Sequence, residues 1–329
     1  MRRRDFINFL SVATVAWPLS LHAQQVERTR QIAILIPFRD DEPQVKARLT
    51  AFKQRLHELG WIEGRNIRFE YRFTSQDPER IRAAAEELIA LGPDVIVAWS
   101  NTTVVILQKA TQTIPIVFAG ASDPVESGFV ANLSRPGGNI TGFQNFEAEI
   151  AGKWLDLLKE IAPAVRRIAF VHSPNISANV VFVHTAEAAS TLLGVTVTAA
   201  AVQSIGDIEH VLMDFAREPS GGLILAPFPL VATNRDRIIA LASDLHLPAI
   251  YPFRYFATSG GLASYGFDPV EPHRQVASYV DRILKGEKPG DLPVQAPTRY
   301  ELVINLKTAK ALGLAVSPTL LARADEVID

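Results

Sequence analysis

Small polar side chains follow the predicted ends of several strands, where an open parallel sheet presents its ligand site. Ser100, Asn101 and Thr102 follow one predicted buried strand, and Ser122 and Asp123 follow the next strand along the chain. Their hydroxyl, amide and carboxylate groups could bind a ligand beside the free N–H groups of a helix N-terminus. The same residue types are ordinary helix N-caps, which is the alternative for each of them. The pattern favours a polar ligand-binding edge at this end of the predicted sheet.

The second half of the chain supplies polar groups and aromatic rings at equivalent positions. Ser173 and Asn175 follow one predicted strand, and Phe228, Tyr251 and Tyr255 lie at or just beyond the ends of two others. The rings could stack on an apolar or aromatic ligand, although Phe228 could equally be a core residue. If the two halves face each other, hydrogen-bonding groups from one half would oppose aromatic rings from the other.

Two arginines lie in these loops, Arg39 after the first predicted strand and Arg254 close to Tyr251. A guanidinium group can hold a ligand carboxylate through two parallel hydrogen bonds. An ordinary salt bridge to a protein carboxylate fits either arginine equally well. The predicted ligand-binding residues are Arg39, Ser100, Asn101, Thr102, Ser122, Asp123, Ser173, Asn175, Phe228, Tyr251 and Arg254.

The sequence lacks the common motifs of catalysis and cofactor binding. It contains no glycine-rich dinucleotide or phosphate loop, no Gly-x-Ser-x-Gly nucleophile elbow and no His-Glu-x-x-His zinc motif. The seven histidines show no metal-ligand spacing, and the absence of cysteine excludes disulfides and thiolate metal sites. We therefore expect no enzymatic activity, no cofactor and no metal. The alternative is an exported enzyme that uses Asp123 or His172 as its acid–base group.

The composition is typical of a globular protein with more than one domain. The 329 residues are 48% hydrophobic, and the formal net charge is −2. This charge gives no reason to expect a nucleic acid or an anionic membrane surface as partner. A chain of this length usually divides into two domains, because a single hydrophobic core seldom serves so many residues.

Alternating strand and helix patterns must position the candidate residues. A run of buried-strand character at 32–36 precedes Val45, Leu49, Phe52 and Leu56, whose spacing places them on one face of a helix. Similar pairs of patterns recur along most of the chain. This alternation predicts an α/β fold of two doubly wound parallel-sheet lobes, with helices on both faces of each sheet.

The alternation lapses twice, and the predicted lobe boundaries lie at the lapses. The first lapse, at 120–147, contains a Pro-Gly turn, and the second, at 252–269, contains paired glycines. The predicted organisation is an N-terminal lobe of residues 24–146 and 266–290, a C-terminal lobe of residues 147–252, a return crossover at 253–265, and a tail at 291–329 near the hinge. The tail is assigned to neither lobe.

Residues 1–23 have the three regions of a cleaved export signal. Arg3 and Arg4 precede an apolar stretch at 9–21 and an Ala-x-Ala-like end at Ala23. Paired arginines before such a stretch are typical of the twin-arginine route, which moves folded proteins. The stretch is too short to span a membrane. We therefore expect a periplasmic protein, and a basic N-terminus on a cytosolic protein is the alternative.

Seven short segments carry a more specific pattern. They are Leu56-x-x-Leu59-Gly60-Trp61-x-x-Gly64-Arg65-Asn66, Pro93-Asp94-Val95-Ile96-Val97, Ile114-Pro115-Ile116-Val117-Phe118, Ser122-Asp123-Pro124-Val125, Arg135-Pro136-Gly137-Gly138-Asn139-Ile140-Thr141-Gly142, Gly260-Gly261-Leu262-x-Ser264-Tyr265-Gly266 and Asn305-Leu306-Lys307-Thr308-Ala309-Lys310. In this order they resemble the ABC-transporter substrate-binding family that includes bacterial tryptophan- and tyrosine-binding proteins. The resemblance covers nearly the whole chain after residue 23. It implies a type I periplasmic-binding fold with three interlobe crossovers and ligand capture near 100–102 and 122–123. The loops at Arg39 and at 227–229 depart from the forms associated with amino-acid binders.

These observations together predict a periplasmic substrate-binding protein of an ABC importer. Its two lobes are expected to close by hinge rotation around a small solute, such as an amino acid or an aromatic carboxylate. The expected partners are this solute and a membrane permease, with no nucleic acid, and the protein is expected to be a monomer. A ligand-sensing subunit that docks on a receptor is a further alternative.

Overall fold

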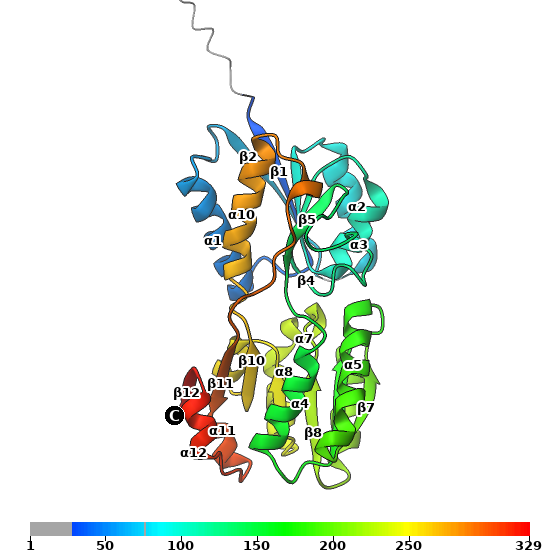
Figure 1. Ribbon diagram of the computed structural model, residues 1–329, viewed down its shortest axis with the longest axis vertical. Helices are drawn as coiled ribbons and strands as arrows, with labels where there is room; N and C mark the ends of the chain where they lie inside the picture. The colour runs from blue at the N-terminus through cyan, green and yellow to red at the C-terminus, as the bar shows by residue number, and fades with distance from the viewer. Residues whose placement is uncertain (1–27, 76) are drawn as a thin grey trace, which may run out of the picture.

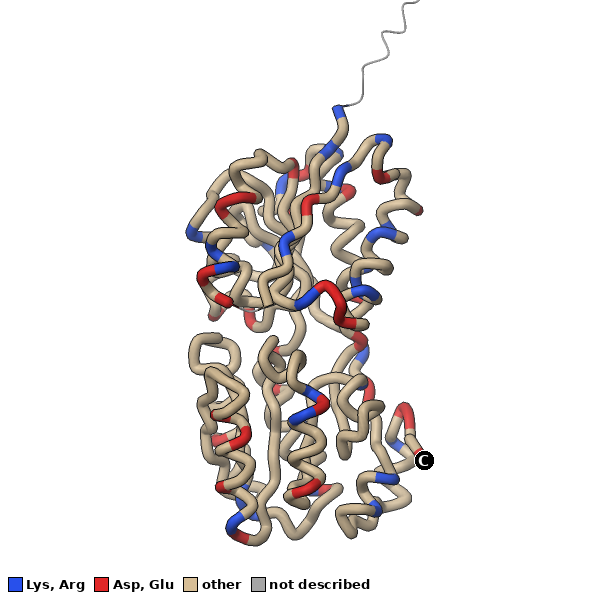
Figure 2. Tube along the Cα trace, turned by 180° about the vertical axis from the view of Figure 1, so that it is seen from behind, with Lys and Arg blue, Asp and Glu red and all other residues tan. Residues whose placement is uncertain are grey.

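The computed structural model describes residues 28–75 and 77–329, which form two α/β lobes stacked along the long axis of the molecule (Figure 1). The predicted export signal lies outside the described residues. No helix among the described residues is long and apolar enough to cross a membrane. Basic and acidic residues are interspersed along both lobes in the view of Figure 2.

The first lobe is built on a five-stranded parallel sheet in the order β2-β1-β3-β4-β5. Its elements are β1 (Arg30–Ile36), α1 (Pro43–Glu58), β2 (Ile67–Phe73), α2 (Pro78–Ala90), β3 (Val95–Trp99), α3 (Asn101–Ala110), β4 (Ile116–Ala121), β5 (Ile140–Gln144) and α10 (Glu271–Leu284). Side chains alternate between the two faces of β1. Ile32 and Ile34 pack on the side of α1 and α10, while Ala33 and Leu35 pack on the side of α2 and α3. Both faces are therefore buried, as an all-parallel sheet requires.

The second lobe contains a seven-stranded sheet in the order β12-β11-β10-β9-β8-β6-β7. Its elements are α4 (Ile150–Ile161), β6 (Arg167–His172), α5 (Ser177–Ser190), the 3₁₀ turn η1 (Thr191–Leu193), β7 (Thr196–Ala201), α6 (Ile205–Ala216), β8 (Gly221–Leu225), α7 (Pro229–Thr233), α8 (Arg235–Asp244), β9 (Ala249–Tyr251), α9 (Arg254–Thr258), β10 (Ala263–Gly266), β11 (Glu301–Asn305), α11 (Leu306–Ala311), α12 (Pro318–Arg323) and β12 (Glu326–Ile328). Strands β6 to β10 are parallel and repeat the strand order of the first lobe, while β11 runs antiparallel to β10.

Three segments cross between the lobes, at 145–149, 267–270 and 293–300, with the 3₁₀ turn η2 (Pro289–Asp291) leading into the third. The third crossing pairs with the end of β5. The N–H of Gln144 donates to the carbonyl of Gln295 over 2.8 Å, and the N–H of Gln295 donates to the carbonyl of Gly142 over 3.1 Å. The third crossing is therefore tied by backbone hydrogen bonds to the end of β5, where the first crossing begins.

The predicted return crossover at 253–265 requires a correction. These residues form α9 and β10, and β10 pairs with β9 and β11 inside the second sheet. The paired glycines allow close packing, because a Cβ at Gly261 would lie 2.7 Å from the Tyr251 ring and 2.9 Å from the carbonyl oxygen of Phe256. The return to the first lobe comes later, at 267–270, and α10 then packs against α1 (Figure 1).

The tail that the sequence left unassigned belongs mainly to the second lobe. After the third crossing, β11 and β12 extend the second sheet, and α11 and α12 lie between them along the chain (Figure 1). Leu302, Ile304, Ala309 and Leu320 lie in the hydrophobic core of that lobe. Burial of these side chains explains why the C-terminal segment is attached to the second lobe.

Candidate functional site

A cavity of about 590 Å³, open in part to solvent, lies between the two lobes at the carboxyl ends of the parallel strands. This is where open α/β sheets bind ligands. Residues from both lobes line it, namely Phe38, Arg48, Trp99, Ser100, Asn101, Ala119, Gly120, Ser122, Asn145, Ile176, Pro227, Phe228, Pro229, Ala232, Phe253, Tyr255, Pro269 and His273. Its largely apolar wall with a few polar groups is typical of a small-molecule site.

Four of the eleven predicted ligand-binding residues line this cavity: Ser100, Asn101, Ser122 and Phe228. Tyr255, which the sequence suggested as a stacking residue, lines it as well. The other predicted residues are absent from the cavity wall: Arg39, Thr102, Asp123, Ser173, Asn175, Tyr251 and Arg254.

Ser100 has an unusual backbone and an unused hydroxyl. Its φ of 84° and ψ of 159° lie in a region that side-chain-bearing residues seldom occupy. Although it stands at the N-cap position of α3, its side chain makes no capping hydrogen bond. Its Oγ is buried without a hydrogen-bond partner. Capping, the alternative role for this serine, therefore does not account for it.

Asn101, in contrast, uses its amide to connect two parts of the first lobe. Its Nδ2 donates to the carbonyl of Ser122 over 2.8 Å, and its Oδ1 accepts the N–H of Ser122 over the same distance. Both residues are buried. This pair of bonds holds the start of α3 against the loop after β4. The hydrogen bonds between Asn101 and Ser122 therefore fix the position of both residues in the cavity wall.

Asp123 follows Ser122 but lies outside the cavity wall. Its backbone is left-handed, with φ of 44°, and its carboxylate accepts the N–H of Glu126 over 3.4 Å. Burial raises the pKa of this carboxyl group above its ordinary value. Further along the same loop, Ser127 Oγ is 3.0 Å from Ser177 Oγ at the start of α5. This contact joins the two lobes at the mouth of the cleft.

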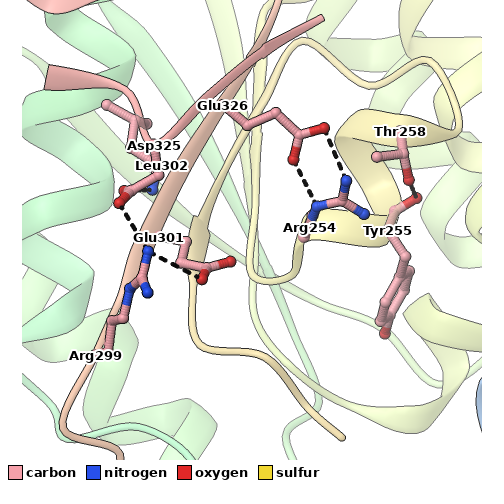
Figure 3. Close-up of polar contacts among 8 residues, drawn as sticks. All are labelled: Arg254, Tyr255, Thr258, Arg299, Glu301, Leu302, Asp325 and Glu326. Carbon is pink, nitrogen blue, oxygen red and sulfur yellow. Dashed lines mark hydrogen bonds and ion pairs between the residues drawn. The ribbon is translucent and has the colours of Figure 1, made fainter. Parts of the chain in front are cut away.

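The two arginines predicted as carboxylate clamps are engaged elsewhere. Arg39 is exposed and pairs with Asp41 over 2.6 Å. Arg254 donates from Nε and Nη2 to the two carboxylate oxygens of Glu326 over 2.6 and 2.8 Å (Figure 3). In the same view, Tyr255 points away from this pair (Figure 3). The prediction of a ligand clamp at these two positions is corrected here, because each guanidinium already has a protein carboxylate.

The remaining predicted residues have local roles or lie at the surface. Tyr251 is buried in the core of the second lobe and stacks on Phe256, with ring centroids 5.0 Å apart. The N–H of Ser173 donates to Asn179 Oδ1 over 3.1 Å, and Asn175 is exposed. Thr102 is half-buried on α3. Of the two tyrosines in this region, Tyr255 is the one that reaches the cavity, and burial raises its pKa to about 12.

Arg48, which the sequence analysis missed, is buried in the cavity wall with 9% of its surface exposed. Its guanidinium lies 5.7 Å from the centroid of Phe38 and interacts with the Tyr255 side chain across the lobe interface. Its Nε has no hydrogen-bond partner. Among residues 28–75 and 77–329, no salt bridge to Arg48 is present. Burial lowers the pKa of the guanidinium, although the group stays protonated at any physiological pH.

A signal for Arg48 was present in the helix pattern. It lies three residues after Val45 and four before Phe52, so all three occupy one face of α1. A charged residue within an apolar helix face is unusual and needs a partner. Arg48 was missed because only the apolar residues of this helix were considered.

His273 on α10 is a second residue that the sequence analysis passed over. It is buried, its ring lies edge-on to Trp99 with centroids 4.3 Å apart, and its Nδ1 is 2.9 Å from the carbonyl of Pro269. A carbonyl only accepts, so Nδ1 carries the proton and Nε2 is a free acceptor. Nε2 has no hydrogen-bond partner. Burial, and then the charge of Arg48, hold the pKa of this imidazole well below its ordinary value, so it is neutral at pH 7.

The groups proposed for the alternative acid–base chemistry lie apart from the cavity. Neither Asp123 nor His172 lines it. His172 is buried at the end of β6, and burial lowers the pKa of its imidazole. Within the described part of the chain, no cluster of three or more histidine, aspartate and glutamate side chains could hold a metal ion.

Comparison with known proteins gives a consistent result. Residues 31–328 match the family model described as ABC transporter substrate binding protein. The chain is 24% identical over 280 residues, or 83% of its length, to a tyrosine-binding protein of Clostridioides difficile strain R20291, of which 79% is covered. A conserved domain protein from Vibrio cholerae is 29% identical and superposes with a TM-score of 0.85 over 91% of this chain and all of that one.

An ABC domain from Streptococcus pneumonia, solved in complex with L-Trp, superposes with a TM-score of 0.84 at 23% identity. The superposition covers 91% of this chain and all of the other. These matches agree with the predicted periplasmic-binding fold of two doubly wound lobes, which the strand orders above confirm. Because the family model extends over nearly every described residue, the chain belongs to the ABC transporter substrate-binding protein family.

Proposed function

We propose that this protein captures a small organic solute in the interlobe cavity and delivers it to a membrane permease. The observation that carries the proposal is the cavity itself, whose wall combines Phe228 and Tyr255 of one lobe with Trp99 and Ser100 of the other. A ligand that contacts both walls stabilises the closed arrangement by its differential affinity for that arrangement. The three crossovers are the segments about which the lobes would rotate.

The ligand is expected to leave the site chemically unchanged. Among the described residues, the cavity wall contains no acid or nucleophile paired with a base, since His273 is its only histidine and no carboxylate lines it. Asp123 and His172 lie away from the wall. Binding without chemistry agrees with the role of the family.

The proposed site of action is the periplasm, reached through the twin-arginine route, with the protein acting as a monomer. Arg3, Arg4 and the apolar stretch at 9–21 support export by this route. Replacement of both Arg3 and Arg4 by lysine should leave the protein in the cytoplasmic fraction, as judged by immunoblot. Replacement of Arg28 by lysine, outside the signal, is the control that should leave export unchanged.

The capture of a solute can be tested by melting the purified protein with a library of amino acids, organic acids, sugars and nucleosides. A bound solute raises the melting temperature, because it binds the folded state. Trp99 lines the cavity, so its fluorescence should change with the same solute. Phe228→Ala should weaken binding, whereas Phe73→Ala, on the exposed edge strand β2, should not. If no solute alters melting or fluorescence, the proposed function is wrong.

A further inference from the structure

Three polar atoms without partners surround the cavity. They are Arg48 Nε, Ser100 Oγ and His273 Nε2, and each is buried. Buried polar groups in folded proteins are nearly always hydrogen-bonded, so three exceptions around one cavity need an explanation. The simplest is a ligand that completes them. The first is a cationic donor, the second a hydroxyl that donates or accepts, and the third a neutral acceptor.

The charge of the cavity is unbalanced. Arg48 carries the only full charge on the wall among the described residues, because no aspartate or glutamate lines the cavity and His273 is neutral. Glu42 and Asp268 act on Arg48 from a distance, but neither lines the cavity. The N-terminus of α3 also faces this edge of the sheet and adds a partial positive charge. The charge of the cavity wall therefore favours an anion.

We propose that the ligand is a monocarboxylic acid with an apolar or aromatic body and no ammonium group, and that its carboxylate pairs with Arg48. This inference rests on the proposed function and names its substrate class. The buried guanidinium, which lacks a protein carboxylate, gains a charge-assisted partner when the ligand binds. Phe38, Phe228 and Tyr255 would enclose the body of the acid.

The absence of an ammonium group is inferred from the groups that the wall lacks. An α-amino acid brings a positive charge, and a buried cation needs an anionic partner or several strong acceptors. Within the described residues the cavity offers no carboxylate, and the neutral Nε2 of His273 supplies only one acceptor. An ammonium group would also lie in the same cavity as the Arg48 charge. Nε2 is better suited to a neutral hydroxyl or N–H group on the ligand.

The test compares pairs of compounds that differ only in the amino group, by isothermal titration. The pairs are L-tryptophan with indole-3-propionate, L-tyrosine with 3-(4-hydroxyphenyl)propionate, and L-phenylalanine with 3-phenylpropionate. The primary amide of each acid controls for the carboxylate charge. We expect at least one acid to bind at least tenfold more tightly than its amino acid and its amide. An amino acid or amide that binds as tightly as the acid would overturn the inference.

Arg48→Gln should weaken binding of the acid about 10- to 100-fold, the range for a lost hydrogen bond between charged groups. The same variant should leave the weak binding of the amide unchanged. A variant that only disturbed the fold would weaken the binding of both compounds. Arg39→Gln is the matched control, since this arginine is exposed and paired with Asp41. An equal loss of acid and amide binding in Arg48→Gln would show that Arg48 supports the fold and does not recognise the carboxylate.

The two proposals fail in different ways. If a sugar, a nucleoside or an amino acid binds in the solute library and no des-amino acid does, the protein captures a solute but the inferred substrate class is wrong. If nothing binds, the proposed function fails and the inference with it. The comparison of acids with amides uses the natural sequence, so it decides the question even if Arg48→Gln does not fold.

Discussion

At the scale of single residues, the cavity combines a strained serine, a buried arginine and a neutral histidine. Each departs from what stability alone would favour. Ser100 has a backbone conformation suited to glycine, Arg48 is a buried charge without a protein carboxylate, and His273 leaves one ring nitrogen unpaired. Strain and unpaired polar groups concentrate at sites that bind ligands, because the rest of the fold maintains them. In the inference above, these three residues would act together on one ligand.

Ser100→Gly should make the unliganded protein more stable. The φ of 84° is unfavourable for serine but open to glycine, and such strain costs about 1–3 kcal/mol. Part of this gain is offset by the greater backbone freedom of glycine in the unfolded chain, so we expect an increase of about 1 kcal/mol in the free energy of unfolding. Urea titration measures it. A clear loss of stability would mean that the Ser100 hydroxyl supports the fold.

His273 should make stability depend on pH below about 6.5. Its pKa is well below the ordinary value in the folded protein, so the unfolded chain binds more protons in this range. The stability is fully present above the unfolded pKa and is lost as the pH falls, by at most about 1.4 kcal/mol per pH unit. Urea titrations at pH 7.5 and 5.5 measure this loss, and His273→Asn should reduce it.

The exposed residue His57 provides the control for this measurement, because His57→Asn should leave the pH dependence as it is. Part of the dependence should persist in His273→Asn, since burial also lowers the pKa of His172. If both variants show the full loss of the natural protein, burial of His273 is not its source.

The sequence could place Ser100 and Phe228 at the cavity because both lie at strand ends, and strand ends meet at one edge of a parallel sheet. The sequence could not show which arginines pair with a protein carboxylate and which are available to a ligand. Glu326, which pairs with Arg254, is 72 residues away along the chain. Arg48 lies within a helix, and the cavity that its side chain lines is formed only when the second lobe lies opposite that helix. Side-chain pairing across such separations is a property of the tertiary structure.

At the scale of elements, the start of α3 and the loop after β4 form one wall of the cavity. The amide of Asn101 holds both backbone groups of Ser122, and its Nδ2 also lies 3.2 Å from Ser127 Oγ. The loop that contacts the second lobe is thus attached to the helix N-terminus that faces the cavity. Movement of one of these elements without the other would break buried hydrogen bonds.

Asn101→Ala should destabilise the first lobe. It leaves the N–H of Ser122 buried without a partner, at a cost of about 1–3 kcal/mol, and leaves the carbonyl of Ser122 with only the longer hydrogen bond from Ser127 Oγ, over 3.4 Å. The change is expected in the free energy of unfolding measured with urea. The neighbouring Thr102→Ala is the control and should have a much smaller effect, since Thr102 is half-buried and absent from the cavity wall. Equal effects of the two variants would contradict a special role for the Asn101 amide.

Most elements of the fold could be predicted from local patterns, because periodicity in apolar residues reflects which faces are buried. The element boundaries near Gly260 and Gly261 could not be predicted in this way. Paired glycines are equally compatible with a linker and with a tight approach of two segments, and here Gly261 packs against Tyr251. Strand β11 escaped assignment because it joins its sheet antiparallel, after a crossing that interrupts the alternation.

At the scale of the whole molecule, the two lobes share one order of five strands but differ in the elements added to it. The second sheet gains β11 and β12 beyond the repeated five strands, while the first lobe takes back α10 from late in the chain. The chain therefore passes between lobes three times, and the crossings hold the cavity at the meeting point of both sheets. The lobes also meet directly, through the contact of Ser127 with Ser177.

The contact of Ser127 with Ser177 provides a way to hold the lobes together. The two Oγ atoms are 3.0 Å apart, and the natural chain has no cysteine, so Ser127→Cys with Ser177→Cys introduces a single possible disulfide. The oxidised double variant should resist separation of the lobes. Hydrogen–deuterium exchange of the segment 99–103, at the cavity, should then become slower and return to its natural rate when a reductant is added. Each single cysteine variant should exchange at the natural rate with or without reductant. If the oxidised and reduced forms exchange equally fast, the segment 99–103 opens while the Ser127 loop and α5 stay in contact. The proposed separation of the lobes at this contact would then be wrong.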